Sequence, residues 1–157
     1  PELGRRHFAV LKVGPALTNA YRQAIYALNA LAGWIAPAAG NRLPEVMEDL
    51  MLANPANWSK HYDGDEARLK LLRHFSYADR IRYYWTQPAA IAAVDRLLDS
   101  LGRVRPLRCV LEQFFAPAVL VRAEALSPRV PDWRKALIYA QIQEALLPYY
   151  ALPGRPA

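Results

Sequence analysis

The spacing of apolar residues along the chain changes near residue 14. Residues 8–13 (FAVLKV) are apolar except at Lys12, which is typical of a short strand with neighbours on both sides. Gly14 and Pro15 end this stretch, and Pro15 suits the first position of a helix that we expect to run to Ile35. The apolar positions that form one stripe along this helix are Leu17, Ala20, Tyr21, Ala24, Leu28, Leu31 and Ile35.

Beyond residue 37 the pattern changes to a succession of six or more short amphipathic helices, separated by prolines and capping residues. The expected helices cover residues 44–53, 55–62, 65–72, 76–85, 88–101, 106–115 and 132–147. Asn54, Asp65 and Ser76 are the predicted N-caps, and Gly102 is the predicted C-terminal glycine. In the last helix, Trp133, Leu137, Ala140 and Leu147 are expected to face a core.

One strand followed only by helices is an unusual inventory for a domain. A lone strand leaves its backbone donors and acceptors unpaired, so the strand at 8–13 predicts partner strands outside this sequence. We therefore expect a mainly α chain with two parts: a strand and helix cut from a larger sheet at 1–36, and a helical region at 37–157.

Composition narrows the class of protein. With 157 residues, 54% hydrophobic and 22% charged, the chain can bury a core. The net charge of +6 comes mainly from arginines scattered along helices, which does not predict nucleic-acid binding but suits phosphate or carboxylate ligands. The single cysteine, Cys109, excludes an internal disulfide and is expected to be buried in a helix. No apolar run predicts a membrane span or a signal peptide, so a soluble cytoplasmic protein is expected.

The histidines do not form a metal-binding pattern. His7, His61 and His74 lack the spacing of a zinc motif, and the acidic run at 63–66 lacks the final glutamate of a calcium loop. We expect no metal site built from this chain alone and no catalytic residue in it.

The passage from strand to helix is a candidate anion site. Free amides near Ala16 and Leu17 would point outward at the positive end of the helix dipole, although an ordinary strand–helix connection would have the same form. Lys12, near the end of the strand, would contact a substrate phosphate or act as a base, or its stem would pack while the ammonium group extends into solvent. Thr18 would donate its hydroxyl to a phosphate or bond its own backbone.

The segment SYADRIRYYW at 76–85 holds the densest group of arginine and aromatic side chains. Arg80, Arg82 and Tyr84 would contact an anion or a partner subunit. The alternative is a helix whose aromatic residues enter the core while its arginines bridge acidic neighbours.

Three blocks of sequence carry a resemblance to a known family: HFAVLKVGPALTNAYRQAIYAL, EVMEDLMLANPANWSKHY and SYADRIRYYW. In order and spacing they resemble the D-tagatose-1,6-bisphosphate aldolase non-catalytic subunits, the GatZ/KbaZ proteins, from about His7 to Tyr150. That family is similar to class II aldolases, which are (β/α)8 barrels. The resemblance implies that this chain is the last βα unit of a TIM-type barrel followed by a C-terminal helical extension.

The resemblance also implies a phosphate-binding loop after the last barrel strand. The residues at the corresponding positions are Lys12, Gly14, Ala16, Leu17 and Thr18. This chain has KVGPALT where catalytic relatives carry an asparagine-containing run, which leaves the backbone amides as the expected ligands. The histidines that bind zinc in class II aldolases belong to earlier strands, so zinc or another divalent metal is expected only in the complete protein or its partner.

The function implied is that of an accessory subunit, which supports the activity and stability of a catalytic aldolase subunit in tagatose 6-phosphate catabolism. The complete protein is expected to be oligomeric. The alternative is a portion of a metal-dependent 4-epimerase that interconverts fructose 6-phosphate and tagatose 6-phosphate.

Overall fold

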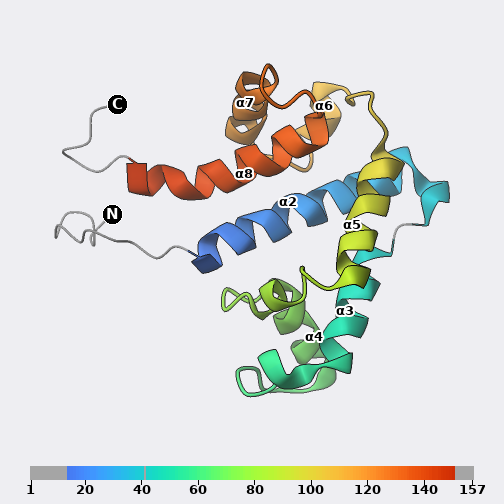
Figure 1. Ribbon diagram of the computed structural model, residues 1–157, viewed down its shortest axis with the longest axis vertical. Helices are drawn as coiled ribbons and strands as arrows, with labels where there is room; N and C mark the ends of the chain where they lie inside the picture. The colour runs from blue at the N-terminus through green and yellow to red at the C-terminus, as the bar shows by residue number, and fades with distance from the viewer. Residues whose placement is uncertain (1–13, 41, 151–157) are drawn as a thin grey trace.

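The computed structural model describes residues 14–40 and 42–150, and within them the chain is helical, without a strand (Figure 1). The predicted strand at 8–13, including Lys12, lies outside these residues. The α-helices are α2 (Gly14–Ile35), α3 (Leu43–Ala53), α4 (Glu66–Phe75), α5 (Pro88–Leu101), α6 (Arg108–Leu111), α7 (Pro117–Leu126) and α8 (Trp133–Tyr150). The 3-10 helices are η1 (Pro37–Ala39), η2 (Pro55–Asn57) and η3 (Arg80–Tyr83). None of these helices is long and apolar enough to cross a membrane.

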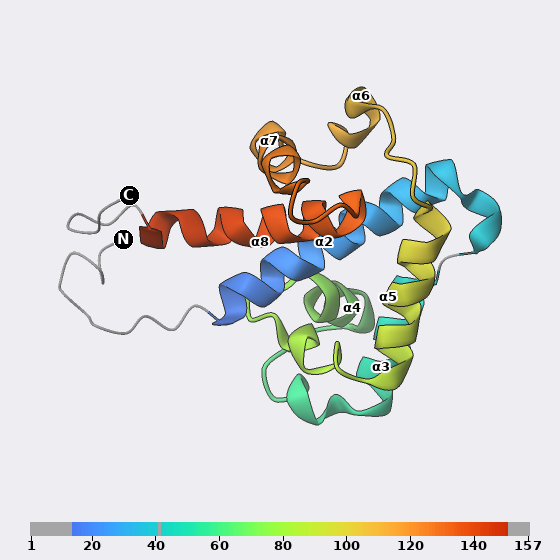
Figure 2. The ribbon, with the colours of Figure 1, turned by 45° about the horizontal axis from the view of Figure 1, so that its top comes forward.

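Helix α2 is the centre of the arrangement. It contacts α8 on one side and α5 and η3 on the other, while α7 packs on α8 and α3 packs on α4 and α5 (Figures 1 and 2). The predicted stripe explains this position, because Ala20, Ala24, Leu28 and Leu31 are all buried. The prediction that Ile35, at the end of the stripe, is buried is wrong, since this residue is 41% exposed.

Several boundaries follow from the predicted caps. Asp65 precedes α4 and its Oδ1 accepts a hydrogen bond from the Arg68 amide at 2.8 Å. Helix α5 starts at Pro88 as predicted, and Gly102 ends it with φ of 66°, a backbone conformation that favours glycine. The helix expected at residues 55–62 is shorter in the structure, where only the 3-10 helix η2 follows Asn54.

The helix predicted at 76–85 is wrong. Ser76 follows the end of α4 and its Oγ accepts from the Ala78 amide at 3.1 Å, which forms a turn. Asp79 then has φ of 49° and ψ of 45°, the left-handed region in which a right-handed helix cannot continue. Only the 3-10 helix η3 follows. The physical reason lies in α2, because this turn brings the Asp79 carboxylate against Thr18 and Arg22.

The region after α5 also differs from the prediction. The helix expected at 106–115 is reduced to α6, and Cys109 on it is exposed, so its predicted burial is wrong. In α8, Trp133, Leu137 and Ala140 are buried as expected, whereas Leu147 is 38% exposed.

Candidate functional site

The first turn of α2 brings together four of the five predicted phosphate-binding residues. Gly14, Ala16, Leu17 and Thr18 follow one another there, and Lys12 lies outside the described residues. The first amides of a helix have no acceptor within the helix, and they lie at the positive end of its dipole. The first turn of α2 has no acidic side chain that would compete for these amides. The turn can therefore receive an anion through backbone groups.

The hydroxyl of Thr18 is already engaged. It lies 3.3 Å from the carbonyl oxygens of both Gly14 and Pro15, and it donates to the Oδ2 of Asp79. A hydroxyl has one hydrogen to donate, and the charged carboxylate is the strongest acceptor within its reach. A phosphate at this turn would therefore bind to the backbone amides and not to the Thr18 hydroxyl.

Asp79 fixes the beginning of α2 to the segment that follows α4. Its side chain is completely buried, and Oδ1 lies 3.4 Å from the Nε of Arg22. Asp79 is the one non-glycine residue with positive φ in the part of the chain that the structure describes. Such a backbone costs about 1 kcal/mol or more and persists only where the surroundings hold it, as the contacts with Thr18 and Arg22 do here.

Tyr84, one of the predicted anion or partner contacts, is a core residue instead. It is 2% exposed, and its hydroxyl donates to the carbonyl of Asn54, which ties η3 to the end of α3. Burial raises the pKa of Tyr84, although hydrogen bonds with Asn57 oppose that rise.

Arg80 and Arg82 lie on either side of Ile81 at the surface of η3. The guanidinium carbons of Arg80 and Arg82 lie 6.0 and 4.3 Å from the ring centroid of Tyr83. Arg82 donates to the carbonyls of Ala78 and Asp79 at 2.6 and 2.9 Å, so it closes the turn before η3. Within residues 14–40 and 42–150, neither arginine forms the predicted bridge to a carboxylate. Their contact with an anion or partner stays a prediction.

A second group of titratable residues lies between α2, α3 and α4 and was not predicted from the sequence. The hydroxyl of Tyr26 lies 2.5 Å from Nδ1 of His74, and Nε2 of His74 lies 3.0 Å from the carboxylate of Glu48. Glu48 in turn accepts from Arg73, which also contacts Glu66. Because a carboxylate only accepts, His74 donates from Nε2 and, when neutral, accepts from Tyr26 at Nδ1.

The environment keeps this group in one protonation state. Burial lowers the pKa of His74, and the Glu48 carboxylate only partly offsets this effect. Burial also raises the pKa of Tyr26 far above its ordinary value. For Glu48, burial would raise the pKa, but hydrogen bonds and charge from Arg73 and His74 outweigh it and the pKa is lowered. At neutral pH the group is a neutral imidazole between a phenol and a carboxylate.

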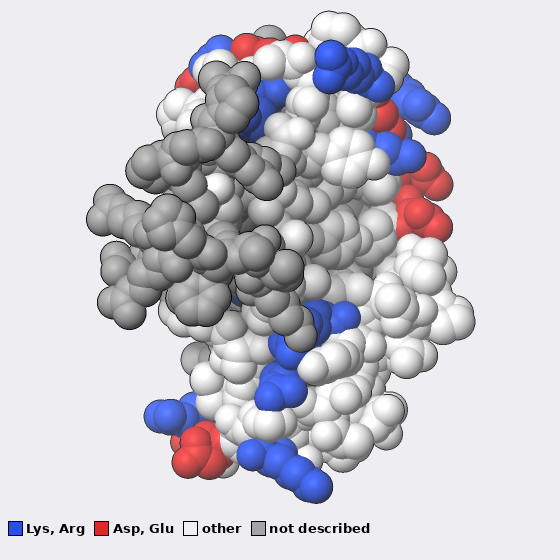
Figure 3. All heavy atoms as spheres, turned by 60° about the vertical axis from the view of Figure 1, so that its left-hand side comes forward, with Lys and Arg blue, Asp and Glu red and all other residues white. Residues whose placement is uncertain are grey.

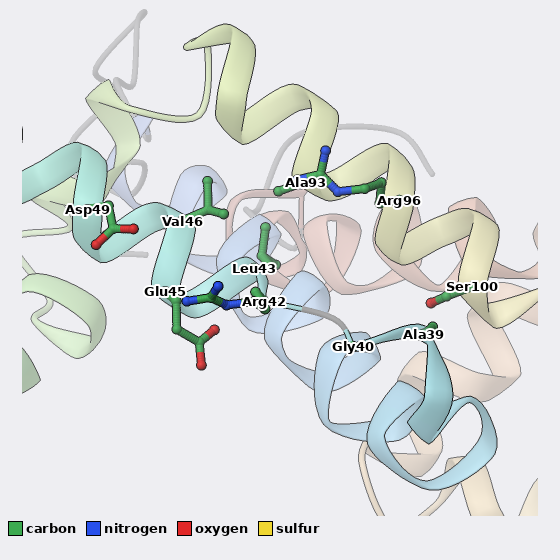
Figure 4. A pocket seen from close by; sticks show the side chains of 10 residues that line it. All are labelled: Ala39, Gly40, Arg42, Leu43, Glu45, Val46, Asp49, Ala93, Arg96 and Ser100. Atoms are coloured by element: carbon green, nitrogen blue, oxygen red, sulfur yellow. The ribbon is translucent and has the colours of Figure 1, made fainter.

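Two hollows adjoin this region. A cavity of about 670 Å³ is lined by Tyr26, His74 and Glu48 together with the apolar side chains of Leu71 and Phe75. A smaller one, of about 310 Å³, lies between α3 and α5 and is lined by the residues shown in Figure 4. Arg42 and Arg96 there are balanced by two acidic side chains of α3, Glu45 and Asp49, so its charge favours neither an anion nor a cation. It contains none of the predicted site residues.

The described residues do not fit a metal ion. Within residues 14–40 and 42–150, no group of three or more histidine, cysteine, aspartate or glutamate side chains could hold one.

Comparison with known proteins agrees with the three sequence blocks. A family model described as D-tagatose-1,6-bisphosphate aldolase subunit GatZ/KbaZ-like matches residues 1–152. A protein of Agrobacterium fabrum (strain C58) named D-tagatose 6-phosphate 4-epimerase is 41% identical over 154 residues, which are 97% of this chain. A crystal structure described as a probable tagatose 6 phosphate kinase from Sinorhizobium meliloti 1021 is similar with a TM-score of 0.80 and 44% identity over 92% of this chain.

Both relatives are much longer than this sequence. The chain spans 35% of the Agrobacterium protein and 37% of the Sinorhizobium chain. The descriptions of these three matches refer to different reactions, but each of them concerns a phosphate of tagatose.

Proposed function

This chain belongs to the D-tagatose-1,6-bisphosphate aldolase subunit GatZ/KbaZ-like family, and we propose that the protein carrying it acts on phosphorylated ketohexoses as a 4-epimerase. The reaction would interconvert tagatose 6-phosphate and fructose 6-phosphate. The observation that carries this proposal is the 41% identity, over 97% of the chain, with a protein named for that reaction.

In this proposal the present chain contributes phosphate binding and support rather than the reacting groups. The amides of Gly14, Ala16 and Leu17 would bind the phosphate, because the first amides of a helix have no acceptor within the helix and lie at its positive end. Lys12 would add a positive charge from the preceding segment, which lies outside the described residues. Asp79 would keep the first turn in place through Thr18. Any divalent metal would be held by parts of the protein beyond this chain.

The architecture proposed with this function is the last βα unit of a TIM-type barrel, with α2 as its helix and the remaining helices as an extension. The long amphipathic α2 supports this proposal, since its buried stripe suits a helix that packs against a barrel strand.

The accessory role is the second candidate, and the family description favours it because it refers to an aldolase subunit. In that case the protein would bind and stabilise a separate catalytic aldolase subunit. Arg80 and Arg82 would be candidates for the contact, since both are half-buried on η3 and neither has a carboxylate partner among the described residues.

One experiment separates the two roles. The intact protein is incubated with tagatose 6-phosphate and a divalent metal, without an aldolase subunit, and carbon NMR follows the sugar. Formation of fructose 6-phosphate is expected. If no conversion occurs, and the protein instead raises the activity or thermal stability of an added catalytic aldolase subunit, the epimerase proposal is wrong and the accessory role holds.

A further inference from the structure

A hollow of about 340 Å³ lies beside the early turns of α2, where the end of α4 approaches it. Figure 2 shows α4 beneath α2 in this region, and Figure 3 shows basic side chains gathered near the middle of the face at which α2 begins. The side chains that line the hollow are one arginine, two amides and three aromatic residues, with no carboxylate among them: Asn19, Arg22, Gln23, Tyr26, Phe75 and Tyr77.

Arg22 is fixed in place before any ligand arrives. Its side chain is 6% exposed, its Nε faces the Asp79 carboxylate at 3.4 Å, and its Nη2 donates to the Oδ1 of Asn19. Among the hydrogen bonds of the described residues, Nη1 has no acceptor. A guanidinium held along one edge can offer the other edge to an oxyanion at little entropic cost.

Each of the two amides is oriented by a hydrogen bond that its oxygen accepts from a neighbouring side chain. Oδ1 of Asn19 accepts from Arg22, and Oε1 of Gln23 accepts from Nε2 of Gln141 at 3.2 Å. The NH2 groups of Asn19 and Gln23 therefore remain to donate. Together with the guanidinium they supply several side-chain donors, which suits a ligand that carries several oxygen acceptors and negative charge.

The aromatic residues give the hollow an apolar wall. Phe75 is 57% exposed and Tyr77 92% exposed, which is high for large apolar side chains of a folded helical protein. The rings of Tyr26 and Phe75 meet edge to face with centroids 5.9 Å apart. Such a wall can cover the C–H face of a small carbon skeleton while the polar groups bind its charged end.

We propose that this hollow is a binding site for a phosphate monoester, with Arg22, Asn19 and Gln23 on the phosphate and Phe75 and Tyr77 on its carbon skeleton. The site is separate from the amides of the first turn of α2, and it does not depend on the reaction proposed above. Its volume falls in the range of about 300–1,000 Å³ that small-molecule sites occupy.

The test changes the charge at the exposed rim of the hollow. Calorimetric titration of the intact protein with inorganic phosphate, tagatose 6-phosphate and unphosphorylated tagatose compares the wild type with Gln23→Glu and Gln23→Lys. Ala30→Glu is the matched control, because it adds the same carboxylate at another exposed position of α2 that lies two turns further along the helix. Tyr77→Ala tests the aromatic wall.

We expect Gln23→Glu to weaken phosphate binding about five- to tenfold, because it places a carboxylate next to the ligand. Gln23→Lys should strengthen binding, Ala30→Glu should leave it unchanged, and tagatose should not bind. A loss in Tyr77→Ala confined to tagatose 6-phosphate would support a phosphorylated sugar as the ligand, whereas unchanged binding of both ligands would overturn the contact of Tyr77 with a carbon skeleton. If the wild type binds neither ligand, or if Gln23→Glu and Gln23→Lys both bind as Ala30→Glu does, the proposal is wrong.

Discussion

Replacing Glu48 by glutamine should strongly destabilise the packing of α3 against α4, although it only exchanges one carboxylate oxygen for an NH2 group. The side chain of Arg73 is completely buried, and its Nε lies 3.1 and 3.0 Å from the two carboxylate oxygens of Glu48. Its guanidinium also lies over the Trp58 ring, 4.8 Å from the centroid. Glu48→Gln keeps the shape of the side chain but removes the only well-buried negative charge that faces this arginine among the described residues.

The expected loss is about 3 kcal/mol, because breaking a buried ion pair leaves an uncompensated charge. Urea unfolding followed by tryptophan fluorescence should show it, since Trp58 lies next to Arg73. For a chain of this size, 3 kcal/mol corresponds to a midpoint lower by roughly 1.5 M urea.

Glu66 provides the matched control. It contacts the same guanidinium, but its side chain is 70% exposed, so Glu66→Gln should cost less than about 1 kcal/mol. Equal losses in the two variants would refute the reasoning, because burial would then not decide the strength of the pair.

Three further outcomes follow from the buried polar groups. Thr18→Val should lower the free energy of unfolding by about 1–3 kcal/mol, because it leaves Oδ2 of the buried Asp79 carboxylate without its donor, whereas Thr18→Ser should not; thermal unfolding compares them. Burial lowers the pKa of His74 below 6.5, so the contribution of neutral His74 to the free energy of unfolding is complete above pH 6.5 and is lost as the pH falls toward the lowered pKa. His74→Gln should remove this pH dependence of the urea midpoint. The hydrogen bonds from Arg134 lower the pKa of Asp132 from 3.8 to about 2. About 1–2 kcal/mol of the free energy of unfolding, present above pH 3.8, should therefore be lost as the pH falls to about 2. Asp132→Asn should lack this acid-dependent loss in the same urea titrations.

Local patterns predicted the elements whose conformation depends on their own residues. The helix from Pro88 to Leu101 begins with proline and ends before a glycine with positive φ, and the structure has the same bounds. Asp65 caps α4 as its position predicted. Such signals act within one turn of the chain, so a neighbouring segment is not needed to interpret them.

The misassigned segment at 76–85 depends on a residue far away in sequence. Nothing near Asp79 indicates that its carboxylate will meet Thr18, which is 61 residues earlier, and this contact goes with the left-handed backbone that interrupts the helix. The same limit applies to His74, since Tyr26 and Glu48 lie on other helices. An arginine or a histidine within an amphipathic pattern does not show by itself that it will be buried.

The first turn of α2 could be proposed as an anion site from the sequence, because the first amides of any helix lack an acceptor within the helix, and its binding of an anion stays a prediction. The role of Thr18 could not be predicted, since its two alternatives, donation to a phosphate or to its own backbone, differ only in which acceptor lies near the hydroxyl. The structure supplies a third acceptor, Asp79, alongside the backbone carbonyls of Gly14 and Pro15.

A crystal structure of the intact protein with tagatose 6-phosphate would test the central claim most directly. We predict that phosphate oxygens lie about 3 Å from the amide nitrogens at the start of α2, between Gly14 and Leu17, while the Thr18 hydroxyl stays on Asp79. If no phosphate lies on these amides and they face protein or solvent instead, the central claim is contradicted, whether or not the hollow beside Arg22 is occupied.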